Sequence, residues 1–176
     1  TRLDKEDKVF SDFLPGTHAY NIYSIPEKSD QVIRKLLHTE KILHLSGVLA
    51  ESILHSYKGQ LTRQKVFLNV RDTRFDIIIM DQHKLQFANM FEFRQPEDLV
   101  YFTLFVMEQT GLSTETTDVI LMGKVMPKSA LYNLIFKYLR KVEFARRNPA
   151  FQYGAVFREL SPHAMFPLIN LYQCGL

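Results

Sequence analysis

Cysteine, tryptophan and long apolar runs are scarce in this chain. Its 176 residues include a single cysteine, Cys174, and no tryptophan. One cysteine excludes an intrachain disulfide and a metal site built from cysteines alone, and it is typical of a reducing compartment such as the cytoplasm. No stretch approaches the roughly 18 apolar residues that a membrane span requires. Internal repeats and low-complexity segments are also absent, so we expect an ordinary folded chain.

Hydrophobic residues make up 46% of the sequence, with 14 phenylalanines and 8 tyrosines among them. A chain of this size can bury one real core or two small lobes without a disulfide or a metal. The net charge of +3 and the pI near 8.9 are too mild to indicate nucleic-acid binding by themselves.

The most informative pattern begins at residue 65 and predicts strand, turn, strand, turn, strand, helix, strand, helix. The turns are the polar segments Asp72-Thr73 and Asp81-Gln82-His83, which suit two hairpins. Three antiparallel strands followed by alternating helices and strands predict an α/β protein with a mixed sheet. The expected segments are Lys65–Val70, Phe75–Met80, Leu85–Phe93, a helix after Pro96, Asp118–Met122 and a helix from about Lys128.

The first sixty residues predict a smaller lobe of strand, helix, strand and helix. We expect an irregular segment over residues 1–20, strands at 21–25 and 41–45, and helices capped by Ser29 and Ser46. The predicted division is an α/β lobe at 1–60 and a second domain at 61–176.

Residues 66–79, VFLNVRDTRFDIII, resemble the start of the second half of an actin-like ATPase. That superfamily includes actin, heat-shock chaperones, sugar kinases and the bacterial proteins FtsA and PilM. A closer resemblance, over essentially the whole chain, is to an uncharacterised bacterial domain-of-unknown-function family with this fold. It is carried near the C-terminus by Tyr153, Phe157, Leu160, His163, Phe166, Asn170, Leu171, Tyr172 and Cys174.

This resemblance implies a ribonuclease-H-like fold for residues 61–176. It also implies that residues 1–60 are the remainder of a first actin-like domain, and that an N-terminal domain of the parent protein lies outside this chain.

The superfamily binds phosphate with an Asp-x-Gly-x-x-Thr/Ser loop between the first two strands. The matching positions here are Asn69, Arg71 and Arg74. Asparagine lacks the charge that holds a hydrated magnesium ion, and arginine adds bulk where glycine lets backbone N–H groups approach phosphate. The Gly-Gly adenosine motif is reduced to Gly123-Lys124. The resemblance therefore implies degenerate nucleotide loops, whose candidate residues are Asn69, Arg71, Asp72, Thr73, Arg74, Gly123 and Lys124.

Other chemistries find less support. A ribonuclease-H-type nuclease needs an acidic residue on its first strand, and we expect Asp76, Glu97, Asp98 and Asp118 to be solvated or capping carboxylates. The six histidines show no ligand spacing, so no metal site is predicted, and His163 is interpreted as a packed or capping residue.

The stretch 137–153 interleaves basic and aromatic residues, a composition found on single-strand nucleic-acid surfaces. Alternation along the predicted strands Lys141–Ala145 and Phe151–Phe157 favours a solvated charged face with inward aromatics instead. Pro167 is expected to interrupt the last helix.

The leading hypothesis is a non-catalytic, cytoplasmic actin-like scaffold or interaction module that needs no cofactor and acts through protein partners. The first alternative is an ATP-binding protein in which Asp72 or Thr73 serves an altered phosphate loop with Mg-ATP. The second is a weak nucleic-acid-binding protein that uses residues 137–153. No catalytic residue is assigned.

Overall fold

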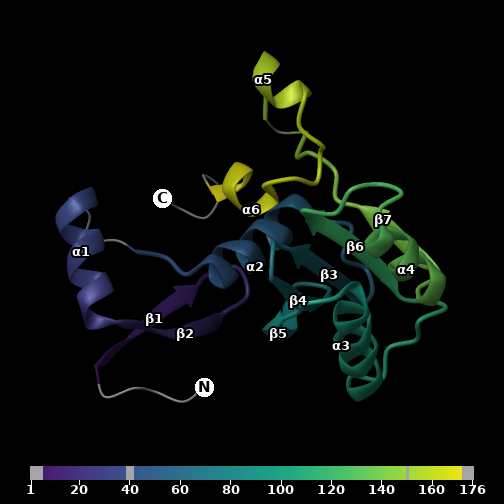
Figure 1. Ribbon diagram of the computed structural model, residues 1–176, viewed down its shortest axis with the longest axis horizontal. Coiled ribbons are helices and arrows are strands. Elements are labelled where there is room, and N and C mark those ends of the chain that lie inside the picture. Colours follow the sequence, from purple (N-terminus) through teal and green to yellow (C-terminus); the bar gives the residue numbers. More distant parts are fainter. Residues whose placement is uncertain (1–5, 39–41, 150, 172–176) are drawn as a thin grey trace.

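The computed structural model describes residues 6–38, 42–149 and 151–171, which form a mixed α/β structure (Figure 1). In chain order its elements are β1 (Asp7–Leu14), β2 (Ala19–Pro26), α1 (Glu27–Leu37), α2 (Leu45–Ser56), β3 (Lys65–Val70), β4 (Arg74–Asp81), β5 (Lys84–Glu92), α3 (Pro96–Gln109), β6 (Asp118–Gly123), α4 (Ala130–Tyr138), β7 (Lys141–Phe144), α5 (Ala155–Arg158) and α6 (Phe166–Ile169).

A five-stranded sheet in the order β5-β4-β3-β6-β7 forms the centre of the fold. β4 pairs antiparallel with β3 and β5, whereas β6 pairs parallel with β3 and with β7. The predicted mixed sheet is thus confirmed, and so is the sequence of three antiparallel strands followed by alternating helices and strands. The parallel pairs need the crossovers that α3 and α4 supply.

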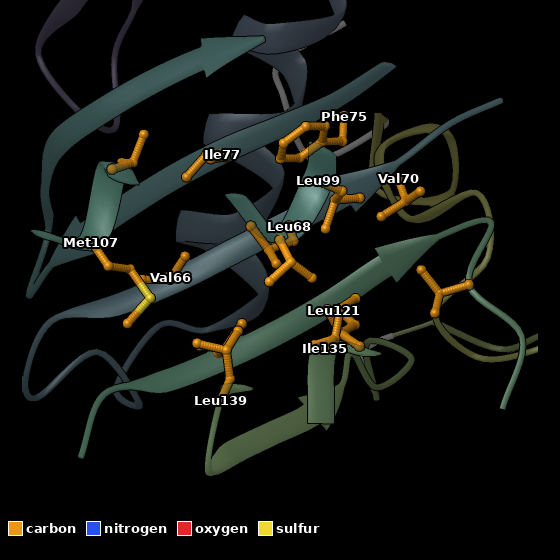
Figure 2. Packing of buried hydrophobic residues seen from close by; sticks show 14 of the residues in the cluster. Val66, Leu68, Val70, Phe75, Ile77, Leu99, Met107, Leu121, Ile135 and Leu139 are labelled. Atoms are coloured by element: carbon orange, nitrogen blue, oxygen red, sulfur yellow. The ribbon is translucent and has the colours of Figure 1, made fainter. Parts of the chain in front are cut away.

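Both faces of the sheet are covered, and this explains the nearly continuous apolar runs of its central strands. On one face Val66, Leu68 and Val70 of β3 belong to a buried cluster with residues of α3 and α4 (Figure 2). On the other face Phe67 packs in a second buried cluster that includes Leu49 and Ile53 of α2.

The N-terminal segment differs from its prediction. Residues 7–14 are not irregular but form β1, which pairs with β2 along its whole length. The order strand, helix, strand, helix is therefore wrong, because two strands precede two helices. Polar residues such as Lys8, Ser11 and Asp12 interrupt the apolar pattern by which a strand is predicted from sequence. The segment forms a strand because it pairs with β2. Whether the chain divides near residue 60 stays a prediction.

The strand expected at residues 41–45 is also absent from the described part of that segment. Residue 41 lies outside the described residues, 42–44 are irregular, and α2 already begins at Leu45. His44 caps this helix in place of the predicted Ser46, since its side chain accepts a hydrogen bond from the Ser46 N–H.

Near the C-terminus the predicted strand at 141–145 is found as β7, but the predicted strand at 151–157 is wrong. β7 lies parallel to β6, and residues 155–158 instead form the short helix α5, which extends away from the sheet (Figure 1). Pro167 lies in the first turn of α6 rather than interrupting a helix. Tyr172 and Cys174 lie outside the described residues. No helix in the described ranges has the length and apolar character needed to cross a membrane.

A single buried carboxylate joins the β1–β2 hairpin to α2. Glu51, only 3% exposed, accepts hydrogen bonds from the backbone N–H groups of Gly16 and Thr17 in the hairpin turn, at 3.1 and 3.3 Å. A side chain at Gly16 would lie 2.5 Å from Leu54 and 2.8 Å from Glu51, so the turn fits closely against the helix. Glu51 therefore fixes where the hairpin lies on the rest of the molecule.

We predict that Glu51→Ala lowers the free energy of unfolding by about 2–3 kcal/mol, because two backbone donors lose a charged acceptor. Urea denaturation measures the loss, and hydrogen exchange should accelerate over residues 7–26. Glu115→Ala, which removes an exposed ion pair with Arg140, is the control and should cost less than about 1 kcal/mol. Equal losses in the two variants would contradict the role given to Glu51.

Candidate functional site

The predicted nucleotide loops meet at one end of the central sheet. Val70, the last residue of β3, lies opposite Phe75 of β4 on one side and Gly123 of β6 on the other. This register brings the β3–β4 turn, residues 71–74, next to Gly123 and Lys124. The structure thus places all the candidate loop residues together, including Asn69 on the preceding strand.

Asn69 and Arg71 bind the same buried carboxylate. The Asn69 side-chain amide donates to one oxygen of Asp76 and the Arg71 guanidinium to the other, both at 3.0 Å. Asp76 is only 2% exposed, so the expectation that it is solvated or capping is wrong. Burial raises the pKa of Asp76, while Asn69, Arg71 and the nearby His44 act in the opposite direction. Asn69 lies opposite Asp76 across the β3–β4 hairpin, and this pairing was not predicted from the sequence.

The two other cationic candidates are also paired with carboxylates. The Lys124 ammonium contacts both oxygens of Asp72 at 2.7 and 2.9 Å, which links the β3–β4 turn to the end of β6. Arg74 pairs with Glu92 of β5 at 2.8 Å. Each cation that the sequence offered for phosphate therefore has an acidic partner within the chain.

Backbone N–H groups in the two loops are used as well. The amide of Arg71 donates to the carbonyl of Arg74, and the amide of Lys124 donates to the carbonyl of Val70, each at 2.8 Å. The Gly123 amide donates to the His163 carbonyl at 2.9 Å. A phosphate-binding loop presents such N–H groups to its ligand, whereas these close the loops on themselves.

The glycine of the candidate adenosine motif has a packing role. Gly123 has φ of 81°, and a Cβ there would lie 2.1 Å from the carbonyl oxygen of Val70. A side chain at this position is excluded by the close approach of β6 and β3, whether or not a nucleotide binds.

Between the hairpin and this edge lies a polar group that sequence reasoning missed. His44 accepts from Ser46 N–H through Nδ1 at 3.3 Å, and its own backbone N–H donates to Asp12 at 3.3 Å. Its ring lies 4.9 Å from that of Tyr23. Burial lowers the pKa of His44, opposed by Asp76, and keeps the imidazole neutral. His44 thus connects β1, β2 and the start of α2, although nothing in the sequence around it indicates this role.

The remaining candidates have structural roles. Asp98 caps α3 by accepting from the Arg94 and Gln95 amides, as expected, and Asp118 pairs with Arg63 and Lys65. His163 is packed, as expected: it lies 4.2 Å from the Phe144 ring, and its Nε2 is 2.8 Å from the Val125 carbonyl. Burial lowers its pKa. Within the described ranges no group of three or more His, Cys, Asp or Glu residues is arranged to hold a metal ion.

In the basic and aromatic stretch 137–153, three arginines contact groups of the same chain. Arg140 pairs with Glu115 and Arg146 with Glu143. Arg147 donates to the carbonyls of Phe157 and Leu160. The ring of Phe144 stacks against Tyr132 and His163 and so points inward as expected, whereas Tyr138 is 44% exposed.

An open hollow of about 640 Å³ lies beside the β3–β4 turn. Its lining includes three carboxylates, Asp72, Glu92 and Asp98, and one cation, Arg94. The other lining residues are Thr73, Phe93 and Phe102. Since Asp72 pairs with Lys124 and Glu92 with Arg74, these charges largely offset one another.

We predict that Gly123→Ala destabilises the protein far more than Gly111→Ala. Gly111 also has positive φ, 68°, but a Cβ there meets nothing within 4 Å, so alanine costs only about 1–2 kcal/mol of backbone strain. At Gly123 the clash with the Val70 carbonyl adds to that strain. Denaturant midpoints of the two variants give the comparison, and equal midpoints would contradict the close approach.

A second prediction concerns pH. An unfolded histidine protonates near pH 6.5, whereas the folded chain resists protonating His44 and His163 until lower pH. The unfolded state then binds more protons, so the free energy of unfolding should fall as pH drops below about 6.5. His44→Asn keeps a side-chain cap and should flatten part of this fall, while His44→Ala should flatten it and lower stability at every pH. Chemical denaturation between pH 5 and 8 measures these profiles. An unchanged slope in both variants would show that His44 is not the titrating group.

Comparison with known proteins agrees with this fold. A solved structure from Bacteroides thetaiotaomicron, described as a protein with actin-like ATPase fold and unknown function, matches with a TM-score of 0.79 at 22% sequence identity. The match covers 99% of this chain and 62% of that one, so the chain spans less than two thirds of the length of this neighbour. At this identity the likeness concerns the fold alone.

No curated protein matches the sequence. A family model does match it, over residues 1–142, and its description is "Protein of unknown function (DUF3822)". The match covers most of the chain and confirms the predicted resemblance to an uncharacterised family with an actin-like fold. The chain belongs to the DUF3822 family of proteins of unknown function.

Proposed function

We propose that this chain is a non-catalytic, cytoplasmic interaction module with an actin-like fold, which acts through protein partners and does not hold Mg-ATP. The observation that supports this most directly is the pairing of its loop cations. Arg71, Arg74 and Lys124 each contact a carboxylate of the same chain.

The pairing at Asp76 is the most costly to break. If a phosphate drew Arg71 away, Asp76 would keep only Asn69 as a hydrogen-bonding partner in a site that is 2% exposed. Removing one partner of a buried ion pair costs about 3–5 kcal/mol. The Arg74 and Lys124 pairs are exposed and weaker, but each still neutralises charge that a phosphate would need.

The whole protein is part of this proposal. Because the structural neighbour is longer than the matched region, we extend the proposal to a parent protein in which an N-terminal domain accompanies this chain. The single cysteine supports a reducing, cytoplasmic location.

One observation favours the ATP-binding alternative. Asp72 and Thr73, the residues that would serve an altered phosphate loop, border the open hollow beside the turn. Asp72 is already bound to Lys124, however. The nucleic-acid alternative is weakened because Arg140, Arg146 and Arg147 are engaged within the chain.

A nucleotide titration tests the proposal. Millimolar Mg-ATP should leave the thermal midpoint of the chain, and of a longer family member containing it, unchanged. A ligand at 100 times its Kd would stabilise by about 2.7 kcal/mol, which raises the Tm of a domain this size by roughly 5 to 10 °C. Measuring the longer protein matters because half of a cleft could fail to bind.

The matched variants are Asp72→Asn and Thr73→Ala. A shift with Mg-ATP that disappears in either variant would overturn the proposal in favour of an altered nucleotide site. A shift that persists in both, and that ATP gives without magnesium, would indicate binding elsewhere and would also contradict a nucleotide-free module.

A further inference from the structure

We infer that the rest of the parent protein packs on residues 7–37 and completes a hydrophobic core that this segment lacks by itself. The segment consists of the β1–β2 hairpin and α1, which lie at the opposite end of the molecule from α3 and α4 (Figure 1). The inference rests on the proposed function for the existence of a longer parent protein, and it adds which surface of this chain that protein covers.

Residues 7–37 bury very little apolar surface. Among them Leu14 is the only hydrophobic residue that is buried, and it belongs to the cluster under α2. The large hydrophobic residues of the segment that are exposed by 51–71% are Val9, Phe13, Tyr20, Ile22, Val32, Leu36 and Leu37. Apolar surface that gathers in this way on one part of a molecule marks a site of packing against another polypeptide.

Four of the exposed residues lie on one face of the hairpin. Phe13 is opposite Tyr20 in the ladder, and the two rings are 5.2 Å apart. Alternation along each strand places Val9 and Ile22 on the same face as this pair. A two-stranded sheet needs packing against other elements to be stable in water. The exposed fractions show that the described part of the chain leaves this face uncovered.

α1 turns a charged side toward the hairpin. Its one buried residue is Asp30, 2% exposed, which pairs with Lys8 of β1 at 3.0 Å and with Arg34 of α1 at 2.6 Å. Val32 and Leu36, one turn apart on the helix, are 54% and 71% exposed. A surface helix of a globular protein normally packs its apolar side inward. The orientation of α1 is the reverse, so its apolar side is available to a packing partner.

The position of these two apolar surfaces favours a large occupant that folds together with the segment. Lys8, which holds α1, and Phe13 point to opposite faces of β1, so the two surfaces lie on different sides. A short peptide could cover only one of them. Interfaces that resemble a domain core cut in half belong to permanent associations. A missing core therefore favours a permanent neighbour over a partner that binds and leaves.

The same polypeptide is the best source of that neighbour. The Bacteroides structure matches 99% of this chain but only 62% of its own length, so more than a third of it lies outside the matched part. A region in the same chain is held at high effective concentration and loses less freedom on packing than a separate protein does. A second copy offers no additional core, because its residues 7–37 expose the same surfaces.

Substitutions in a longer family member that contains this chain test the inference. Leu36→Lys would place a charge in the completed core and should lower the Tm of the longer protein by about 5 °C or more. Ile22→Thr keeps a β-branched residue in β2 and should lower this Tm in the same direction. Val156→Lys on α5, at a residue 77% exposed, is the matched control and should leave the Tm unchanged. In the 176-residue chain Leu36 is exposed, so Leu36→Lys should have no effect there.

Hydrogen exchange gives a second readout that needs no substitution. Backbone amides of residues 7–37 should exchange more slowly in the longer protein than in this chain, because a completed core resists local opening.

Three results would overturn the inference. The first is a Tm of the longer protein that Leu36→Lys lowers no more than Val156→Lys does. The second is equal exchange of residues 7–37 in the two proteins. The third is self-association of this chain that slows the same exchange and is lost in Leu36→Lys, which would assign the surface to a second copy. Since no nucleotide is used, each of these results is separate from that of the Mg-ATP titration.

Discussion

The central strand β3 must be paired on both sides and covered on both faces, and the rest of the structure follows from that constraint. Its side chains alternate between two buried clusters, one under α3 and α4 and one under α2. A strand in this position has no tolerance for a polar side chain without a partner. The single polar residue in its buried core, Asn69, is accordingly bound to Asp76 across the hairpin.

The same pairing of β3 on both sides determines which loops meet at the candidate site. Because Val70 pairs with Phe75 and Gly123, the β3–β4 turn and residues 123–124 are held against each other at one end of the central sheet. In this chain that proximity is used for internal contacts: Lys124 with Asp72, Arg71 with Asp76, and Gly123 with the Val70 carbonyl. The actin-like frame is present, while the polar groups that would serve a ligand satisfy one another.

The N-terminal hairpin is joined to this frame by few but well-buried contacts. Glu51 holds its turn, and His44 links β1 and β2 to the first turn of α2. The hairpin therefore lies beside the central sheet without pairing with it, and a groove lined by uncharged residues separates the two.

The sequence by itself determined the elements that depend on neighbouring residues. The hairpins from Lys65 to Glu92, the helix after Pro96 and the strand before Gly123 were all predictable, because apolar runs, turn residues and a helix-starting proline act locally. The candidate loop residues could also be named from the sequence, whereas their proximity depends on the pairing of β3 with β6.

Only the tertiary structure decided the elements whose partners are distant in the chain. β1 is a strand because β2 lies beside it, and α2 begins at Leu45 because its apolar residues pack on the sheet. Asp76 reads as an ordinary polar residue until the fold buries it with Asn69 and Arg71. Burial and pairing between remote segments set the ionisation, the ion pairs and the groove, and none of these is encoded in a local pattern.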